Sequence, residues 1–348
     1  MKNQLEVSNV TIKYDEITVV SEISFVLETG SIGCLLGPSG CGKTSLLRAI
    51  AGYESVSSGD IKLQNRLVSQ PDFQVPPEQR HVGMVFQDFS LFPHLSVAKN
   101  VAFGLKNLTS QQRKKRVSEL LALVGLSDLA DVYPHQLSGG QQQRIALIRA
   151  MAPRPDILLM DEPFSSIDSD LREQLSTEVR QLLKADGITA ILVTHDQMEA
   201  FAMADKIGIL GQGQLHQWNT GYQIYHKPVD HFVANFIGRG VMIKGRVVDK
   251  GNVLTEVGIL NGDIPEFYKD GDNVEVLIRP DDVIHNDASE FTLEIKSKSF
   301  RGADFLYSLG LPSGQKILCM VQSHHNHCIG EYIGVELELD DLVILPEK

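Results

Sequence analysis

The stretch Gly37-Pro38-Ser39-Gly40-Cys41-Gly42-Lys43-Thr44 decides the fold of the N-terminal part of the chain. It fits the pattern G-x-x-x-x-G-K-[ST], whose glycines let backbone N–H groups turn toward a phosphate. The apolar run at 32–37 precedes it and predicts a buried strand, and Leu46, Leu47 and Ile50 follow on one face of a predicted helix. Strand, loop and helix in this order predict a phosphate-binding loop at a helix N-terminus, where the helix dipole favours an anion.

Two side chains of the loop carry specific chemistry. Lys43 supplies a positive charge for the β- and γ-phosphates of a nucleotide, and the hydroxyl of Thr44 is a magnesium ligand. A second apolar run at 157–160 predicts another buried strand, which ends in Asp161 and Glu162. Asp161 would hold the magnesium ion, and Glu162 would accept a proton from attacking water. Two acids at a strand end are often an ordinary terminus, but beside a phosphate loop the catalytic interpretation is favoured.

Two further residues complete the predicted site. Gln87 follows a strand-like run at 81–86, so its amide is placed to reach magnesium and the attacking water. His195 ends the predicted strand 190–194 and is placed to bond the γ-phosphate. Either residue alone would be weak support, because a single histidine at a strand end is more often an ordinary polar terminus.

Composition limits the class of protein. A chain of 348 residues is long enough for two domains, and 43% apolar with 22% charged residues is typical of globular proteins. The net charge of −12 argues against a nucleic-acid partner, because phosphate backbones attract clustered Lys and Arg. We expect no signal peptide and no membrane span, and the four cysteines lack the spacing of a disulfide framework.

The pattern divides the chain near residue 238. Residues 1–237 alternate buried strands with helices, which predicts an α/β domain with a mainly parallel sheet. No strong strand signal lies between 87 and 138, so a helical insertion is expected at about 88–150. Its helix at 110–124 has one apolar stripe, with Ser110 as the expected cap. Residues 238–348 are rich in short β-branched runs and predict a small all-β domain of barrel type.

Leu137-Ser138-Gly139-Gly140-Gln141 adds a second anion site, because its serine and glycines stand at the start of a predicted helix. With this motif the chain resembles the ATPase subunit of ABC transporters. The phosphate loop resembles the Walker A motif, residues 157–161 Walker B, Gln87 the Q-loop, 165–168 the D-loop and His195 the H-loop. Ser166 and Ile167 depart from the commoner Ala and Leu of the D-loop.

The resemblance implies ATP and Mg²⁺ as ligands and a homodimer in which two chains enclose two ATP molecules. It implies that Tyr14 stacks on adenine and that Glu162, His195, Gln87 and Lys43 are catalytic, with Thr44, Gln87 and Asp161 at the metal. The residues expected to contact the nucleotide are Tyr14, Gly37, Pro38, Ser39, Gly40, Cys41, Gly42, Lys43, Thr44, Ser45, Ser138, Gly139, Gly140, Gln141 and Asp168.

The C-terminal part is similar to the regulatory β-barrel of the importer branch, most visibly at 276–283. This resemblance implies two transmembrane permease subunits, a periplasmic binding protein and a peripheral position on the cytoplasmic face of the bacterial inner membrane. It also implies that Phe89, Leu91 and Phe92 line a groove for a permease helix, although packing inside the fold explains them equally well. The sequence as a whole is most similar to ferric-iron import ATPases.

Other functions stay open at this level. The same engine could import polyamine, sulfate or sugar, because the ATPase does not touch the solute. An ABC-type ATPase not coupled to transport is a further alternative, although such proteins usually carry two nucleotide domains or a long coiled coil. A phosphate-loop kinase has no use for the motif at Ser138.

One cluster lies outside the nucleotide motifs. Cys319, His324, His325, His327 and Cys328 stand close together in the sequence. Imidazole and thiolate are ligands of soft or borderline metals and are less suited to Fe(III). The simpler interpretation is a polar hairpin tip with incidental histidines, and the alternative hypothesis is a metal-sensing site.

Overall fold

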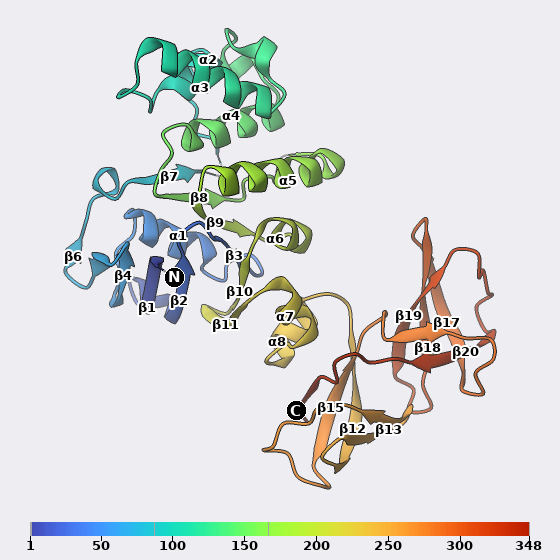
Figure 1. Cartoon of the computed structure of the whole chain (residues 1–348). Helices are drawn as coiled ribbons and strands as arrows, with labels where there is room; N and C mark the ends of the chain where they lie inside the picture. The colour runs from blue at the N-terminus through green and yellow to red at the C-terminus, as the bar shows by residue number, and fades with distance from the viewer. Residues whose placement is uncertain (1, 87, 166, 348) are drawn as a thin grey trace. The chain divides into compact units, whose positions relative to one another are not determined.

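The computed structural model describes residues 2–86, 88–165 and 167–347, and the chain forms two compact units, Met1–Gly221 and Tyr222–Lys348 (Figure 1). The division therefore falls earlier than the expected boundary at 237/238. Segment 222–237 belongs to the second unit because Arg279 donates hydrogen bonds to the carbonyls of Tyr225 and Ile237, at 2.7 and 2.8 Å. His231 Nε2 also lies 2.6 Å from Glu275 Oε2.

The centre of the first unit is a six-stranded sheet in the order β11-β10-β3-β9-β8-β7, parallel except at β11. Its strands are β3 (Ile32–Leu36), β7 (Val82–Val85), β8 (Ile157–Asp161), β9 (Thr189–Thr194), β10 (Lys206–Gly211) and β11 (Gln214–Asn219). Every residue of β3, β8 and β9 is buried, which explains why these strands are almost continuously apolar in the sequence. The predicted α/β class is confirmed.

A second sheet in this unit is antiparallel, in the order β2-β1-β4-β5-β6, and the sequence pattern did not separate it from the parallel one. Its strands are β1 (Asn3–Tyr14), β2 (Ile17–Glu28), β4 (Ser58–Leu63), β5 (Arg66–Gln70) and β6 (Phe73–Gln74). Tight turns join the hairpins, with Asp15, Asn65 and Asp72 at φ of 51°, 64° and 64°. Helix α1 (Lys43–Ala51) shares one buried core with both sheets.

The predicted helical insertion is present as α2 (Val97–Ala102), α3 (Ser110–Leu123) and α4 (Gly139–Met151), with short 3₁₀ turns between them. The apolar stripe of α3 is buried as expected. Its cap is Thr109 rather than Ser110, because Thr109 Oγ1 accepts from Gln112 N while Gln112 closes a capping box. The remaining helices are α5 (Ser169–Ala185), α6 (Gln197–Met203), α7 (Gly221–His226) and α8 (His231–Phe236), with 3₁₀ turns at Pro77–Gln79, Ser127–Leu129 and Pro134–Gln136.

The second unit contains two five-stranded antiparallel sheets that share one apolar core. The first has the strands β12 (Val241–Asp249), β13 (Asn252–Thr255), β14 (Gly258–Asn261), β15 (Asn273–Ile278) and β21 (Ile344–Pro346). The second has β16 (Val283–His285), β17 (Thr292–Phe300), β18 (Asp304–Gly310), β19 (Lys316–Gln322) and β20 (Tyr332–Leu337). The second sheet curls until β16 contacts β19 at its opposite edge, which gives the expected, nearly closed barrel. Among the described residues, no helix has the length and apolar character needed to cross a membrane.

Arg80 ties the antiparallel sheet to the core. Its side chain is 3% exposed and donates five hydrogen bonds of 2.7–2.9 Å. The acceptors are the carbonyls of Ala49, Ile50, Val68 and Val75 and the hydroxyl of Ser69. The first two belong to the last turn of α1, where carbonyls lack helical partners and a cation opposes the helix dipole. Burial lowers the pKa of Arg80 to about 10, so the group remains charged at neutral pH.

We expect Arg80→Met to destabilise the protein by about 3 kcal/mol, because methionine fills the space but removes the donor from the carbonyls of Ile50 and Val75 and from the hydroxyl of Ser69. The carbonyls of Ala49 and Val68 keep backbone donors. The midpoint of urea unfolding measures the loss. Arg66→Met is the matched control, since Arg66 is exposed and its bond to the carbonyl of Gln79 is long, at 3.3 Å. Equal shifts for the two variants would contradict the role assigned to Arg80.

Candidate functional site

The phosphate loop joins the end of β3 to α1 and requires glycine at two close approaches. A Cβ on Gly37 would lie 2.2 Å from the carbonyl oxygen of Leu210. Gly42 has a φ of 96°, and a Cβ there would lie 2.7 Å from the carbonyl oxygen of Val19. Pro38, Ser39 and Gly40 form the exposed crest of the loop, while Cys41 and Gly42 are buried.

Lys43 lies inside the curve of the loop. Its side chain is only 6% exposed, and Nζ donates to the carbonyls of Gly37 and Pro38 at 2.7 and 2.8 Å. The ammonium group is therefore held against the loop backbone, at the concave side that the sequence assigns to the phosphates. The predicted lysine is thus held in place by the loop that it belongs to.

Thr44 and Asp161 meet although 117 residues separate them. Thr44 Oγ1 donates a 2.9 Å hydrogen bond to Asp161 Oδ1, and Asp161 is 3% exposed. Burial raises the pKa of the Asp161 carboxyl, and the bond from Thr44 opposes that rise. A hydroxyl and a carboxylate side by side form the oxygen-rich donor set that magnesium prefers, so these residues fit the expected metal. Gln87, the third predicted ligand, lies outside the described residues.

Glu162 and His195 also come together, with His195 Nδ1 3.2 Å from Glu162 Oε1. Glu162 has a φ of 49°, a left-handed conformation that is uncommon for glutamate and is often found at functional sites. Its backbone is fixed from two sides: its N–H donates to Val193 O at 2.9 Å, and its carbonyl accepts from Gln143 Nε2 at 2.9 Å. The predicted base and the predicted γ-phosphate contact therefore share one edge of the sheet.

Tyr14 and Ser45 flank the loop. The hydroxyl of Tyr14 lies 3.2 Å from Ser45 Oγ, and Tyr14 is 39% exposed. An exposed aromatic ring beside the phosphate loop leaves a face free for stacking, as expected of the adenine contact.

Ser138 begins α4 as its N-cap and is exposed. Its hydroxyl accepts from Gln141 N at 3.3 Å, and Gln141 Oε1 accepts from Ser138 N at 2.9 Å. Gly139 has no atom within 4 Å of where a Cβ would stand, so the space in front of the helix is open. In Figure 1 α4 lies with α2 and α3 in the helical part of the unit, whereas α1 lies among the strands. The predicted second anion site is therefore exposed.

The D-loop is the least described part of the site, because Ser166 lies outside the described residues. Asp168 is exposed and stands immediately before α5. Arg172, which the sequence analysis missed, connects this loop to the H-loop. Its guanidinium donates twice to the carbonyl of Ile167, at 2.9 and 3.2 Å, and once to Asp196 Oδ2 at 2.9 Å. No sequence motif marks this arginine, because its partners come from two separate loops.

The segment that follows Gln87 is fixed against the helical insertion. Phe89, Leu91 and Phe92 are all half-buried, intermediate between a groove lining and a packed core. The buried side chain of Asn100 bonds both backbone groups of Phe92, at 2.9 and 3.1 Å. Arg149 donates to the carbonyls of Phe89 and Ser90, at 3.2 and 2.6 Å. The sequence analysis found neither of these two anchors.

A phosphate loop with a paired Thr44 and Asp161, a glutamate and a histidine at the next strand ends, and an exposed capped helix define an ATP-hydrolysing cassette. A family model described as "ABC transporter" matches residues 20–165, and one described as "TOBE domain" matches 276–345. The chain is 41% identical over 305 residues to the "Fe(3+) ions import ATP-binding protein FbpC 2" of Haemophilus influenzae, covering 86% of this chain and 85% of the relative. It belongs to the ABC transporter family, as the ATP-binding subunit of an importer.

Two further similarities extend this result. The "Spermidine/putrescine import ATP-binding protein PotA" of Oleidesulfovibrio alaskensis is 39% identical over 327 residues, covering 88% of this chain and 86% of the relative. The dimeric structure of the ATP-binding cassette MJ0796 bound to ADP and Pi matches with a TM-score of 0.56 and 31% identity. That match covers 62% of this chain and 98% of the other. The predicted enzyme class, ATP hydrolysis coupled to transport, is confirmed.

We expect Arg172→Gln to lower the kcat of ATP hydrolysis roughly tenfold with little change in KM, because it frees the D-loop from the H-loop without touching the phosphate loop. Steady-state phosphate release measures both constants. Arg180→Gln is the control on the same helix, since Arg180 pairs with Asp205 at 2.7 Å rather than with Ile167 or Asp196, the two partners of Arg172. A normal kcat for Arg172→Gln, or an equal loss in both variants, would refute this coupling.

Proposed function

We propose that this subunit hydrolyses Mg²⁺-ATP in two composite sites of a homodimer and thereby powers the import of ferric iron. In this proposal it works on the cytoplasmic face of the bacterial inner membrane, beneath two permease subunits supplied by a periplasmic binding protein. The observation that supports the composite site is the exposed start of α4, capped by Ser138, which is suited to bind an anion that a second chain presents to it.

The chemistry follows from the residues at the strand ends. Bound Mg²⁺, held by Thr44, Asp161 and Gln87, would neutralise charge on the β- and γ-phosphates. Lys43 stabilises the charge that spreads over the transferred phosphoryl group. Glu162 accepts the proton of the attacking water, and His195, 3.2 Å from it, bonds the γ-phosphate and keeps the carboxylate in position. Tyr14 stacks on the adenine, and residues 37–45 surround the phosphates.

The dimer supplies the remaining contacts. Ser138, Gly139, Gly140 and Gln141 of one chain bind the γ-phosphate held by the other, and Asp168 lies at the same contact. Because each chain offers both halves of a site, the arrangement is isologous and yields two equivalent sites. The MJ0796 cassette, similar over 62% of this chain, is described as a dimer bound to ADP and Pi, which supports this assembly.

The cargo is inferred from similarity. A relative whose name specifies Fe(3+) import is 41% identical, and this supports ferric iron. The spermidine/putrescine relative is 39% identical over a similar share of the chain, so polyamine import is the second candidate. Phe89, Leu91 and Phe92 are proposed to line the groove that receives a permease helix, and they are half-buried in a segment held by Asn100 and Arg149 of the helical insertion.

The composite site predicts rescue between two inactive variants. Lys43→Ala removes the phosphate-loop half of a site and Ser138→Arg blocks the other half, so each homodimer should be inactive. In an equal mixture, half of the dimers carry one variant of each kind and have one intact site, so up to about one quarter of the wild-type rate of phosphate release should return.

The control for this rescue is a mixture of Lys43→Ala with Glu162→Gln. Both changes affect the half of the site that holds the phosphate loop, so every site in the mixed dimer has one defect and no activity should return. Recovery in the control, or no recovery with Ser138→Arg, would contradict a site shared between chains.

Cargo is tested by uptake in a strain that lacks this chain. We expect uptake of labelled ferric iron to fall to background while uptake of labelled spermidine and putrescine is unchanged. Wild-type protein should restore iron uptake, and Glu162→Gln at the same level should not, because loss of a general base lowers turnover by about 10²–10⁴-fold. Loss of polyamine uptake with normal iron uptake would replace ferric iron by the second candidate.

A further inference from the structure

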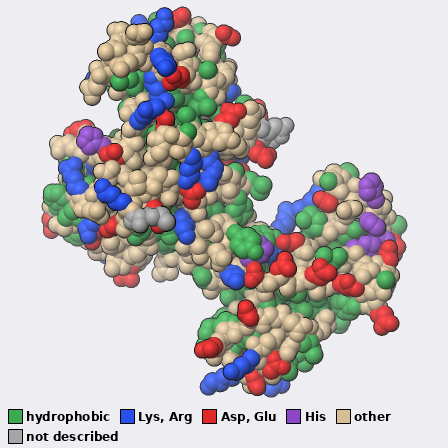
Figure 2. Space-filling view, viewed as in Figure 1, with side chains coloured by type: hydrophobic (Ala, Val, Ile, Leu, Met, Phe, Trp, Pro, Cys, Tyr) green, Lys and Arg blue, Asp and Glu red, His purple; other side chains and the backbone are tan. Residues whose placement is uncertain are grey.

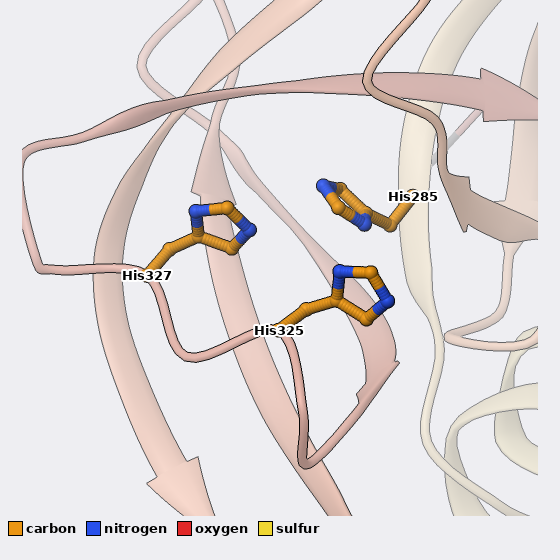
Figure 3. A group of neighbouring side chains, drawn as sticks. All are labelled: His285, His325 and His327. Atoms are coloured by element: carbon orange, nitrogen blue, oxygen red, sulfur yellow. The ribbon is translucent and has the colours of Figure 1, made fainter.

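Three histidines meet in the second unit, far in sequence from the nucleotide residues. His285 ends β16, and His325 and His327 lie in the segment between β19 and β20. One ring nitrogen of each lies within 4.8 Å of those of the other two. Histidine side chains also reach the surface of this unit in the space-filling view (Figure 2). The close-up shows the three rings turned toward one shared space (Figure 3).

The histidine segment is held in place by a buried residue. Tyr307 is 0% exposed, and its hydroxyl donates to the carbonyl of His325 at 2.7 Å while accepting from the N–H of His327 at 3.0 Å. Lys298 Nζ donates to the carbonyl of His327 at 2.8 Å. A hairpin tip with incidental histidines has no need of a buried tyrosine that fixes two of them, so the organisation favours a binding site.

The hydrogen bonds leave ring nitrogens available. His327 Nδ1 lies 3.0 Å from Glu331 Oε1, while its Nε2 is buried and has no hydrogen-bond partner. The side chain of His285 is 7% exposed, and its Nε2 is also buried without a hydrogen bond, although Asp287 Oδ1 lies 3.1 Å away in an unsuitable direction. A buried nitrogen without a partner is costly, and a metal ion would satisfy both nitrogens at once.

Charge and chemistry restrict the ligand. Burial, the largest cause, lowers the pKa of the His285 imidazole. Neutral imidazoles suit borderline divalent ions, whereas Mg²⁺ and Fe³⁺ prefer oxygen ligands. A carboxylate that accepts the second N–H of a ligating histidine, as Glu331 would at His327, is the usual support of such a ligand.

We propose that His285, His325 and His327 bind one borderline divalent metal ion such as Zn²⁺, with Glu331 orienting His327. Tetrahedral Zn–N bonds of about 2.0–2.1 Å place ligand nitrogens roughly 3.4 Å apart. The three ligand nitrogens lie within 4.8 Å of one another, so a small rotation of side chains such as the exposed His325 would bring them to this separation. Three ligands leave a fourth position for water or another exchangeable group.

This site differs from the cluster that the sequence suggested. Cys319 is buried, its Sγ donates to the carbonyl of Val283 at 3.1 Å, and burial raises its pKa to about 12, so it is not a thiolate. Cys328 and His324 are exposed and lie outside the group of three. The missing member was His285, which is distant in the sequence.

The test is calorimetric titration of the full-length protein, freed of metal and without nucleotide, with Zn²⁺, and with Co²⁺ as a visible-spectrum probe. We expect one ion per chain with micromolar or tighter affinity, and intense Co²⁺ bands typical of a tetrahedral site. His325→Ala and His327→Ala should abolish this binding, and Glu331→Gln should weaken it about 10–100-fold. His325 is exposed, so His325→Ala tests the site even where His327→Ala disturbs the fold.

His324→Ala is the matched control, since this adjacent exposed histidine lies outside the group and its loss should leave affinity unchanged. Glu162→Gln should also bind Zn²⁺ normally, and the histidine variants should hydrolyse Mg²⁺-ATP at the wild-type basal rate. Failure of the proposed transport function would therefore leave this result intact. No binding of Zn²⁺, Co²⁺ or Ni²⁺ at micromolar concentration, or an equal loss in His324→Ala and His325→Ala, would overturn the proposal.

Discussion

The register of three parallel strands determines the geometry of the nucleotide site. Leu36 of β3 pairs with Thr194 of β9, and Asp161 of β8 pairs with Val193 of β9. The phosphate loop, the acidic pair and His195 thus leave the sheet side by side. Since all residues of these strands are buried and packed on both faces, a slip of one residue would disrupt the close packing on each face, and the fold resists it. The energy that stabilises the sheet therefore also positions the catalytic groups.

The sequence predicted the motifs and single elements, but not the contacts between separate segments of the chain. The phosphate loop, the strands at 32–36 and 157–161 and the buried stripe of α3 follow from residue type and spacing, and the structure confirms them. Gln143 and Arg80 were missed because they donate to backbone carbonyls of segments 12 or more residues away, and carbonyls leave no signature in a sequence. Arg172 was missed because it joins the carbonyl of Ile167 to the carboxylate of Asp196, which stand in two separate loops. The antiparallel sheet was missed because its alternating strands resemble those of any half-buried sheet.

The histidine group illustrates the same limit in the second unit. Two of its members, His325 and His327, are close in sequence and were identified there, but Cys319 and Cys328 do not belong to the group. The third, His285, reaches the site because β16 pairs with β20, with His285 opposite Val335. Pairing of this kind depends on the closure of the whole sheet, so it is visible only in three dimensions. The predicted nucleotide site and the proposed histidine site lie in different units. The first offers oxygen atoms to a metal ion, and the second offers nitrogen atoms.

Helix α4 links Ser138 to the segment at 89–92 through a continuous helix. Ser138 caps its N-terminus, and Arg149, in its last turn, donates hydrogen bonds to the carbonyls of Phe89 and Ser90. Thirteen helical residues form a nearly rigid rod of about 20 Å. In the proposed dimer, a displacement of the segment at 89–92 would thus be transmitted, with little bending of the helix, to Ser138 at the other chain's nucleotide. The same helix would transmit movement in the opposite direction, so a partner bound to segment 89–92 would be displaced each time the proposed dimer closes and opens.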